Sequence, residues 1–324
     1  NDSSLIRKPI KYLLSDTILF IYDYTLNGGK LLLFNYAGKH LSTIDHSGRG
    51  PKEYTYLYDF NYYNNRVYIY DRADKSFKIY DIYGDFIEKR ETFGFHEFAI
   101  LDQNRYFMYM DNSIYDPITN SNMVLFDPNE NKILKEYQKT EVHSSGIVFG
   151  DQYRLSGTKD FIGLMPRNEN RIYHIDRPTL SDQFTVNFTV PLIGNMSSTE
   201  DAFQAIEDNE YTFPKSYFES SSYVAVSYSS DYRYLGLFNK VTQRSKVLLL
   251  AEEKKCGCGS LIDVKGIKDN YLLVESASND IKDLLEFLHS KGINPEHQCQ
   301  IDYFKNREND NPSLVLIRFN SSTF

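Results

Sequence analysis

Short runs of alternating apolar and polar residues, separated by polar turns, recur along most of this chain. The clearest unit, residues 45–91, contains four strand candidates: 56–62, a dense run of β-formers at 67–71, an alternating run at 77–80 and a polar run at 86–91. Alternation with a period of two is typical of half-buried β-strands. Asn64 and Asn65, between the first two runs, suit a tight turn because Asn tolerates left-handed backbone angles. The unit therefore predicts four antiparallel strands joined by hairpins.

The same rhythm returns along the chain with a period of about 40–55 residues, which indicates a propeller or a solenoid. Further strands are predicted at 17–22, 30–36, 40–45, 106–110, 123–127, 133–137, 161–165, 171–175, 184–190, 223–228, 232–238, 246–250, 271–274 and 314–319. Each repeat has the form of a complete four-stranded meander, which favours a propeller. We therefore predict an all-β fold: a six-bladed β-propeller of four-stranded antiparallel blades, forming one domain over residues 1–324.

Closure of such a ring normally requires the two chain ends to share a blade. The last predicted strand, 314–319, is short of partners, and residues 5–12 could supply one. The pattern leaves the register of that pairing open.

Two segments have a helical pattern instead. Ser198 and Asp201 have the spacing of a capping box, with Ala202, Phe203 and Ile206 expected on one apolar face. A second helix is predicted at 280–291, where apolar residues recur at helical spacing. It lies in an insertion of the last blade, about 276–312, and insertions of that length are usually functional or mobile.

Composition and charge exclude several classes of function. The chain has 324 residues with 27 Tyr, 22 Phe and no Trp, and its formal net charge is −8. Aromatic residues favour strands, and with no run of Lys or Arg we expect no nucleic-acid partner. No stretch approaches the roughly 18 apolar residues that a membrane-spanning helix requires. We expect a monomer that uses no cofactor.

The segment from Gly48 to Tyr54, GRGPKEY, is followed by VYIYD and then by FKIYDIYGDF. In this order it resembles the six-bladed β-propeller lipoproteins of Bacteroidetes, relatives of the NHL-repeat and TolB-like propellers. The ending NPSLVLI, from Asn311, is similar to the last strand of that family. The resemblance implies export to the periplasm or outer membrane, with an anchor on a lipidated Cys upstream of Asn1. It brings no established catalytic residues.

The GRGPKEY loop has two interpretations. Its glycines and Pro51 suit a stiff connector between blades, with Glu53 and Tyr54 bonded and packed at the junction. Alternatively, Arg49, Glu53 and Tyr54 bind a ligand at the mouth of the central channel.

Three cysteines and one histidine form the sharpest candidate for metal chemistry. Cys256, Cys258, His297 and Cys299 could complete a tetrahedral zinc shell, although one residue between paired cysteines is a poor zinc spacing. A disulfide from Cys299 to one of the other two cysteines, and three free thiols, are the alternatives.

These observations favour a non-enzymatic binding or scaffold module of the cell envelope. Its partner would be a peptide, a glycan or a protein held on the channel face of the propeller. The alternative is an envelope hydrolase or lyase in the same channel. Clustered His, Asp, Glu or Arg together with a metal would favour the enzyme.

Overall fold

The structure is a computed structural model. It describes residues 6–24, 28–111, 119–139, 154–157, 161–167, 169–176, 179–193, 196, 198–208, 210–251, 262–276, 286, 289–290, 295–302 and 313–319.

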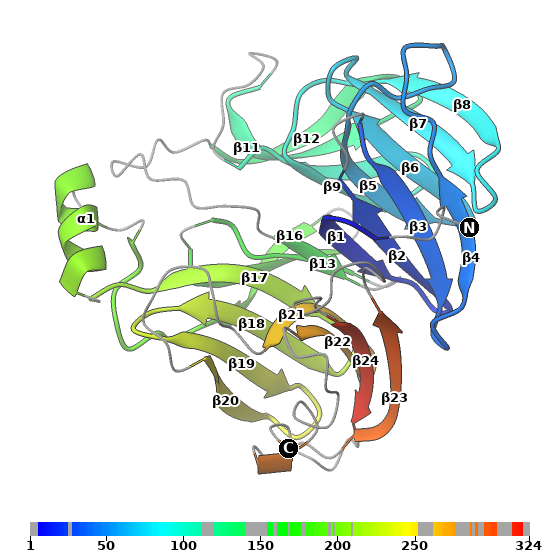
Figure 1. Ribbon diagram of the computed structural model, residues 1–324. Helices are drawn as coiled ribbons and strands as arrows, with labels where there is room; N and C mark the ends of the chain where they lie inside the picture. The colour runs from blue at the N-terminus through cyan, green and yellow to red at the C-terminus, as the bar shows by residue number, and fades with distance from the viewer. Residues whose placement is uncertain are drawn as a thin grey trace.

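Six four-stranded antiparallel sheets are arranged as the blades of a propeller, which confirms the predicted fold (Figure 1). Blade 1 contains β1 (Pro9–Leu14), β2 (Ile18–Asp23), β3 (Lys30–Asn35) and β4 (His40–Ile44). Blade 2 contains β5 (Leu57–Tyr63), β6 (Arg66–Asp71), β7 (Ser76–Asp81) and β8 (Phe86–Glu91). Blade 3 contains β9 (Glu97–Asp102), β10 (Arg105–Tyr109), β11 (Ser121–Asp127) and β12 (Lys132–Lys139).

The second half of the chain builds the other three blades. Blade 4 contains β13 (Leu155–Gly157), β14 (Ile162–Leu164), β15 (Arg171–Asp176) and β16 (Thr179–Thr185). Blade 5 contains β17 (Phe213–Glu219), β18 (Tyr223–Ser229), β19 (Arg233–Asn239) and β20 (Arg244–Ala251). Blade 6 contains β21 (Ile262–Lys268), β22 (Tyr271–Ser276), β23 (Pro295–Asp302) and β24 (Ser313–Phe319), in the spatial order β21-β22-β24-β23.

The predicted closure of the ring is wrong. The strand β24 lies between β22 and β23, so the segment predicted as an insertion supplies the outermost strand of blade 6. The N-terminal segment instead forms β1, which pairs with β2 as the inner strand of blade 1. Each blade is therefore built from one continuous stretch of chain.

Blades 6 and 1 meet through side chains instead of a shared sheet. Tyr12 and Leu19 of blade 1 pack in one apolar cluster with Leu273 and Leu316 of blade 6. At the same junction Lys268 Nζ lies 2.9 Å from Asp16 Oδ1. Apolar burial of this kind is the main force that holds neighbouring blades together.

Short polar turns shape the hairpins. Asn64 and Asn65 have φ angles of 49° and 58°, which confirms the predicted left-handed turn. At the end of β7, Asp81 Oδ1 accepts hydrogen bonds from the N–H groups of Tyr83 and Asp85, at 2.8 and 2.9 Å. Asn35 accepts the equivalent pair in blade 1. These side chains provide acceptors that the turning backbone lacks.

The helix α1 (Thr199–Asp208) lies in the connection between blades 4 and 5, at the edge of the molecule (Figure 1). Its predicted cap is confirmed, because Asp201 N–H donates to Ser198 Oγ at 3.0 Å. Its predicted apolar face is wrong at Phe203, which is 57% exposed. Ala202 and Ile206 instead pack on Phe213, and Phe203 is turned away by about 100° from Ala202.

Within the part of the chain that the structure describes, no helix has the length and apolarity needed to cross a bilayer. The helix predicted at 280–291 falls mostly outside that part, although Glu286, His289 and Ser290 are helical.

Candidate functional site

A charged side chain stands at or near the start of the inner strand in every blade. We call these six residues the charged ring: Lys11, Asp59, Glu97, Arg154, Lys215 and Lys265. Their strands lie side by side around the central axis, with β1 against β21, β17 between β13 and β21, and β9 between β5 and β13. Because all six inner strands run in the same direction, these charges gather at one end of the axis.

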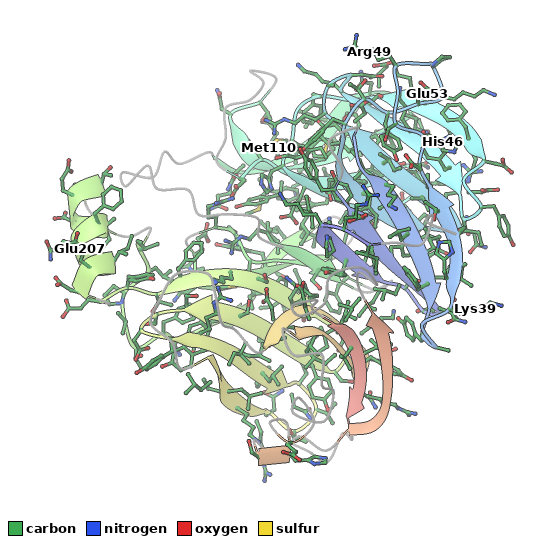
Figure 2. All side chains as sticks on the ribbon, viewed as in Figure 1. Lys39, His46, Arg49, Glu53, Met110 and Glu207 are labelled. Atoms are coloured by element: carbon green, nitrogen blue, oxygen red, sulfur yellow. The ribbon has the colours of Figure 1, made fainter. Side chains whose placement is uncertain are left out.

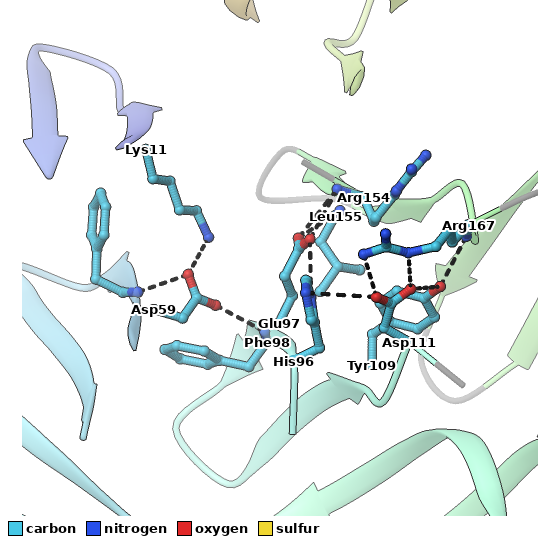
Figure 3. Close-up of polar contacts among 11 residues, drawn as sticks. Lys11, Asp59, His96, Glu97, Phe98, Tyr109, Asp111, Arg154, Leu155 and Arg167 are labelled. Atoms are coloured by element: carbon cyan, nitrogen blue, oxygen red, sulfur yellow. Dashed lines mark hydrogen bonds and ion pairs between the residues drawn. The ribbon is translucent and has the colours of Figure 1, made fainter. Parts of the chain in front are cut away.

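The first part of the charged ring is a buried ion pair between blades 1 and 2. Lys11 Nζ contacts Asp59 Oδ1, and the Asp59 side chain is 4% exposed (Figure 3). The other carboxylate oxygen accepts a hydrogen bond from Phe98 N–H of blade 3 at 3.1 Å. Asp59 therefore connects three consecutive blades through one carboxylate.

Glu97 makes the next connection, from blade 3 to blade 4. Its carboxylate accepts hydrogen bonds from the backbone N–H groups of Arg154, at 3.2 Å, and Leu155, at 3.1 Å (Figure 3). Burial alone would raise the pKa of Glu97, but His96, Lys11 and the Leu155 N–H hold the pKa below its ordinary value. Glu97 is therefore held as a carboxylate at neutral pH.

A second ion pair lies directly behind Glu97. Arg167 Nε donates to Asp111 Oδ1 at 2.9 Å, and both side chains are almost fully buried. Tyr109 Oη–H donates to the same oxygen at 2.9 Å and accepts from Arg167 N–H at 2.9 Å. His96 lies between the two carboxylates, with ring nitrogens 3.6 Å from Glu97 and from Asp111 (Figure 3).

The position of His96 makes stability depend on pH. Burial favours the neutral ring, but Glu97 and Asp111 outweigh it and raise the pKa of His96 above 6.5. A raised pKa means that the contribution is complete below 6.5 and is lost as the pH rises through the folded-state pKa. We expect the stability lost in His96→Gln to be larger at about pH 5.5 than at about pH 8.5. Chemical denaturation of both proteins across this range measures it, and a difference that is constant with pH would contradict the assignment.

The basic part of the charged ring begins with Arg154. Its side chain points away from the Glu97 carboxylate that its backbone contacts (Figure 3). The guanidinium is fully buried, and its Nη2 donates to the Pro214 carbonyl of blade 5 at 3.1 Å. Burial lowers the pKa of Arg154 to about 10, so the group still carries its charge at neutral pH.

Lys215 and Lys265 complete the charged ring in blades 5 and 6. Both stand at β-bulges, where the register of the inner strand skips one residue. Lys265 Nζ pairs with Asp263 at 2.8 Å and Glu275 at 2.9 Å, and lies 5.9 Å from the Tyr12 ring of blade 1. Burial and the charge of Arg233 lower the pKa of Lys215. Bulges often re-aim side chains at functional sites.

The structure gives two of the residues of the GRGPKEY loop clear structural contacts. Glu53 Oε2 accepts a hydrogen bond from Gly50 N–H at 2.7 Å, within the loop. Tyr54 is fully buried, and its hydroxyl donates to the Gly29 carbonyl at 2.8 Å. Arg49 is exposed and lies near the outline of the molecule in Figure 2. Ligand binding by Arg49, Glu53 and Tyr54 stays a prediction.

The strand-ending Asp of the VYIYD motif anchors the exit of the same loop. Asp71 accepts hydrogen bonds from the N–H groups of Thr55, at 2.7 Å, and Tyr56, at 3.3 Å, just before β5 begins. Asp23 does the same in blade 1 for Arg7 and Lys8. These carboxylates fix the start of an inner strand. The charged ring lies at the same end of the inner strands.

The candidate zinc residues are only partly described. Cys256 and Cys258 lie outside the described residues, and His297 and Cys299 are two positions apart on the outermost strand β23. Among the described residues, no group of three or more His, Cys, Asp and Glu side chains could hold a metal ion. The zinc, disulfide and free-thiol alternatives stay predictions.

Sequence reasoning missed the charged ring because it missed the inner strands of five blades. The strands β9, β13, β17 and β21 fall outside every predicted run, and β1 was assigned to the wrong blade. A charge soon after the connection that leads into each inner strand was the available signal, but the following residue is apolar only in some of them, since Lys215 is followed by Ser216 and Lys265 by Gly266. A single charge in a short segment breaks the alternation on which strand prediction depends.

Solved structures with the same architecture come from two Bacteroides species. A protein from Bacteroides fragilis NCTC 9343, described as a predicted exported protein, is 17% identical, with a TM-score of 0.71 over 99% of this chain and 92% of that chain. A member of the DUF4221 family from Bacteroides vulgatus ATCC 8482 is 9% identical, with a TM-score of 0.59 over 99% of this chain and 94% of that chain. At these identities the likeness shows the fold alone.

No curated protein matches the chain. A family profile matches residues 1–318, which is nearly the whole length. The chain therefore belongs to the family described as Domain of unknown function (DUF4934).

Proposed function

We propose that this protein is a non-enzymatic binding module that holds a peptide or glycan at the end of the propeller axis where the charged ring lies. The observation that carries the proposal is the ring itself. Each of the six blades places one charge at or near the start of its inner strand, and buried charges are costly unless they are paired and hydrogen-bonded. The acidic ring residues of blades 2 and 3 lie across the axis from the basic ring residues of blades 4 to 6. A ligand on the axis would therefore meet negative charge on one side and positive charge on the other.

The lengths of the connections between strands also favour this end of the axis as the binding face. Turns at the far ends of the inner strands are short, such as 64–65, 103–104 and 269–270. Connections that lead into the inner strands are longer, such as 45–56, 140–154 and 186–212. Binding residues concentrate on such loops because a rigid scaffold positions them.

We further propose export to the cell envelope, anchoring through a lipid and action as a monomer, as in the NHL- and TolB-like propeller lipoproteins. The resemblance of the GRGPKEY segment and the likeness to a B. fragilis protein described as a predicted exported protein support this location.

A hydrolase or lyase in the same channel is the alternative function. The structure does bring His96, Glu97 and Asp111 together, as an active site would require. However, Glu97 and Asp111 are bonded to backbone N–H groups, to Arg167 and to Tyr109. The pKa of Glu97 is held below its ordinary value, and a carboxylate with a lowered pKa is a poor proton acceptor, so binding is the better interpretation.

The test uses arrays of defined peptides and oligosaccharides that include acidic and neutral members. The variant Lys11→Met/Asp59→Asn removes both charges of one ring pair, so neither charge is left buried without a partner. We expect array members that bind the parent protein to bind this variant at least tenfold more weakly.

The matched control is Lys89→Met/Glu91→Gln, which removes an exposed ion pair on β8 with an N–O distance of 2.8 Å. Binding should be unchanged in the control. An array with no binding member, or equal binding by both variants, would overturn the proposal.

A further inference from the structure

Three tyrosine rings gather at the charged-ring end of blades 1 and 2, and we call them the tyrosine cluster: Tyr24, Tyr56 and Tyr58. Tyr24 follows β2, which ends beside the start of β1, and the other two stand at the start of β5. The ring centroids of Tyr24 and Tyr56 are 6.4 Å apart, with the ring planes at 74°. Those of Tyr56 and Tyr58 are 6.2 Å apart. The cluster therefore offers two ring faces that meet nearly at a right angle.

The tyrosine cluster reaches from solvent to the charged ring. Tyr56 is 37% exposed, and Tyr24 is half-buried. Tyr58 occupies the bulge of β5, where the register of the inner strand skips one residue. Its ring meets His96 edge-on, with the centroids 6.1 Å apart, and His96 lies 3.6 Å from the carboxylate of Glu97. A ligand on the cluster would thus extend toward the charges at the axis.

Two cationic side chains stand against these rings. Lys8 Nζ is 5.1 Å from the centre of the Tyr24 ring, and Arg72 Cζ is 4.5 Å from the centre of the Tyr58 ring. Such contacts are attractive because the face of an aromatic ring carries partial negative charge. They place N–H donors at the edge of the cluster, on both sides of Tyr56.

The backbone under the cluster is fixed by hydrogen bonds. Asp23 accepts Lys8 N–H at 2.6 Å, and Tyr24 N–H donates to the Lys8 carbonyl at 2.9 Å. Asp71 accepts Tyr56 N–H at 3.3 Å. A surface that is already ordered loses little conformational freedom when a ligand binds.

We propose that the tyrosine cluster binds a pyranose ring of a glycan, stacked on Tyr56 and bounded by Tyr24. A pyranose has a flat face of C–H groups and a rim of hydroxyl groups. Its C–H groups pack on the electron-rich face of an aromatic ring. Its rim oxygens accept hydrogen bonds from the ammonium of Lys8 and the guanidinium of Arg72. Tyr58 positions the other rings and connects them to the charged ring.

The same features favour a glycan over a peptide as the ligand. Peptides are recognised through an open strand edge, a groove for an apolar helix face or pockets for successive side chains. The tyrosine cluster offers ring faces edged by charged donors, which match a flat ring with a polar rim. The inference rests on the proposed binding function and selects the glycan from the two ligand classes named there.

The test uses oligosaccharides of glucose, of mannose and of galacturonic acid, with acidic, basic and neutral peptides as the competing class. We expect at least one oligosaccharide to bind and the peptides not to bind. Tyr56→Ala should raise the Kd of the bound oligosaccharide about tenfold, which is typical of the loss of one stacking ring. Tyr56→Phe keeps the ring and should recover most of that affinity. Isothermal titration calorimetry measures each Kd.

The matched control is Tyr83→Ala. Tyr83 is 76% exposed and lies in the turn between β7 and β8, at the other end of the blade. Its removal should leave the Kd unchanged. If Tyr56→Ala does not fold, Lys8→Met decides in its place, because the loss of a donor at the edge of the cluster should also weaken the binding.

Three results would overturn the inference. They are binding of peptides without oligosaccharides, an oligosaccharide Kd that Tyr56→Ala leaves unchanged, and equal losses in Tyr56→Ala and Tyr83→Ala. In the first two cases, weaker binding by Lys11→Met/Asp59→Asn would leave the proposed binding function standing. If neither class of ligand binds, both proposals are wrong.

Discussion

Asp111→Asn is expected to destabilise the protein by about 3 kcal/mol, since it removes the counter-charge of a buried Arg. Arg167 and Asp111 are 7% and 5% exposed, so water cannot solvate the guanidinium that remains. The Asn side chain keeps the size of the Asp and one acceptor oxygen, so the loss reports the charge and not a cavity. The free energy of unfolding from guanidinium titration measures the effect.

The matched control lies in the same blade. Asp102 pairs with Arg105 at 2.6 Å, but both side chains are about one-third exposed. Asp102→Asn should cost less than about 1 kcal/mol, because solvent screens an exposed pair. The double variant Asp111→Asn/Arg167→Gln should recover part of the loss, since it no longer buries an unpaired charge. Equal losses in Asp111→Asn and Asp102→Asn would contradict the role given to the buried pair.

Gly163→Ala is expected to cost about 2–3 kcal/mol by overpacking the junction of blades 4 and 5. A Cβ atom at Gly163 would overlap Tyr217 Oη and lie 2.8 Å from Glu219 Oε2. The Tyr217 ring is fully buried, so it cannot move aside without disturbing β17. A glycine inside a strand often marks such a close approach of a neighbour.

Gly236→Ala is the matched control, because Gly236 also lies in a strand but its nearest neighbour would be 3.7 Å from the new Cβ. We expect it to change the free energy of unfolding by less than about 1 kcal/mol. The double variant Gly163→Ala/Tyr217→Phe removes the overlapping hydroxyl and should be less unstable than Gly163→Ala alone. If the two glycine variants unfold at the same denaturant concentration, the close approach at Gly163 is wrong.

Most of the outer strands could be predicted because their residues follow a local pattern, although β23 fell in the segment predicted as an insertion. Val67 to Asp71 is a dense run of β-forming residues and Phe77 to Tyr80 alternates with a period of two, and the structure places them in β6 and β7. The turn at Asn64 and Asn65 and the cap at Ser198 also depend on neighbours in the sequence. These features follow from rules that act within a few residues.

The inner strands could not be predicted from the local sequence pattern, because their conformation depends on contacts with distant parts of the chain. The strand β17 contains Pro214 and Lys215, and its bulge places the lysine where a regular strand would continue the alternation. The Tyr-rich segment after the GRGPKEY loop shows the same limit. Tyr58 packs at 5.9 Å on Tyr70 of its own blade and at 6.1 Å on His96 of the next blade.

The sequence by itself determined the number of blades, the hairpins and the apolar faces, because alternation and turn residues act locally. Only the tertiary structure decided which segments close the ring, since β1 and β24 each have partners in their own blades. It alone also brought the charged ring together. Its six residues are far apart in the chain and become neighbours only when the inner strands are arranged around one axis.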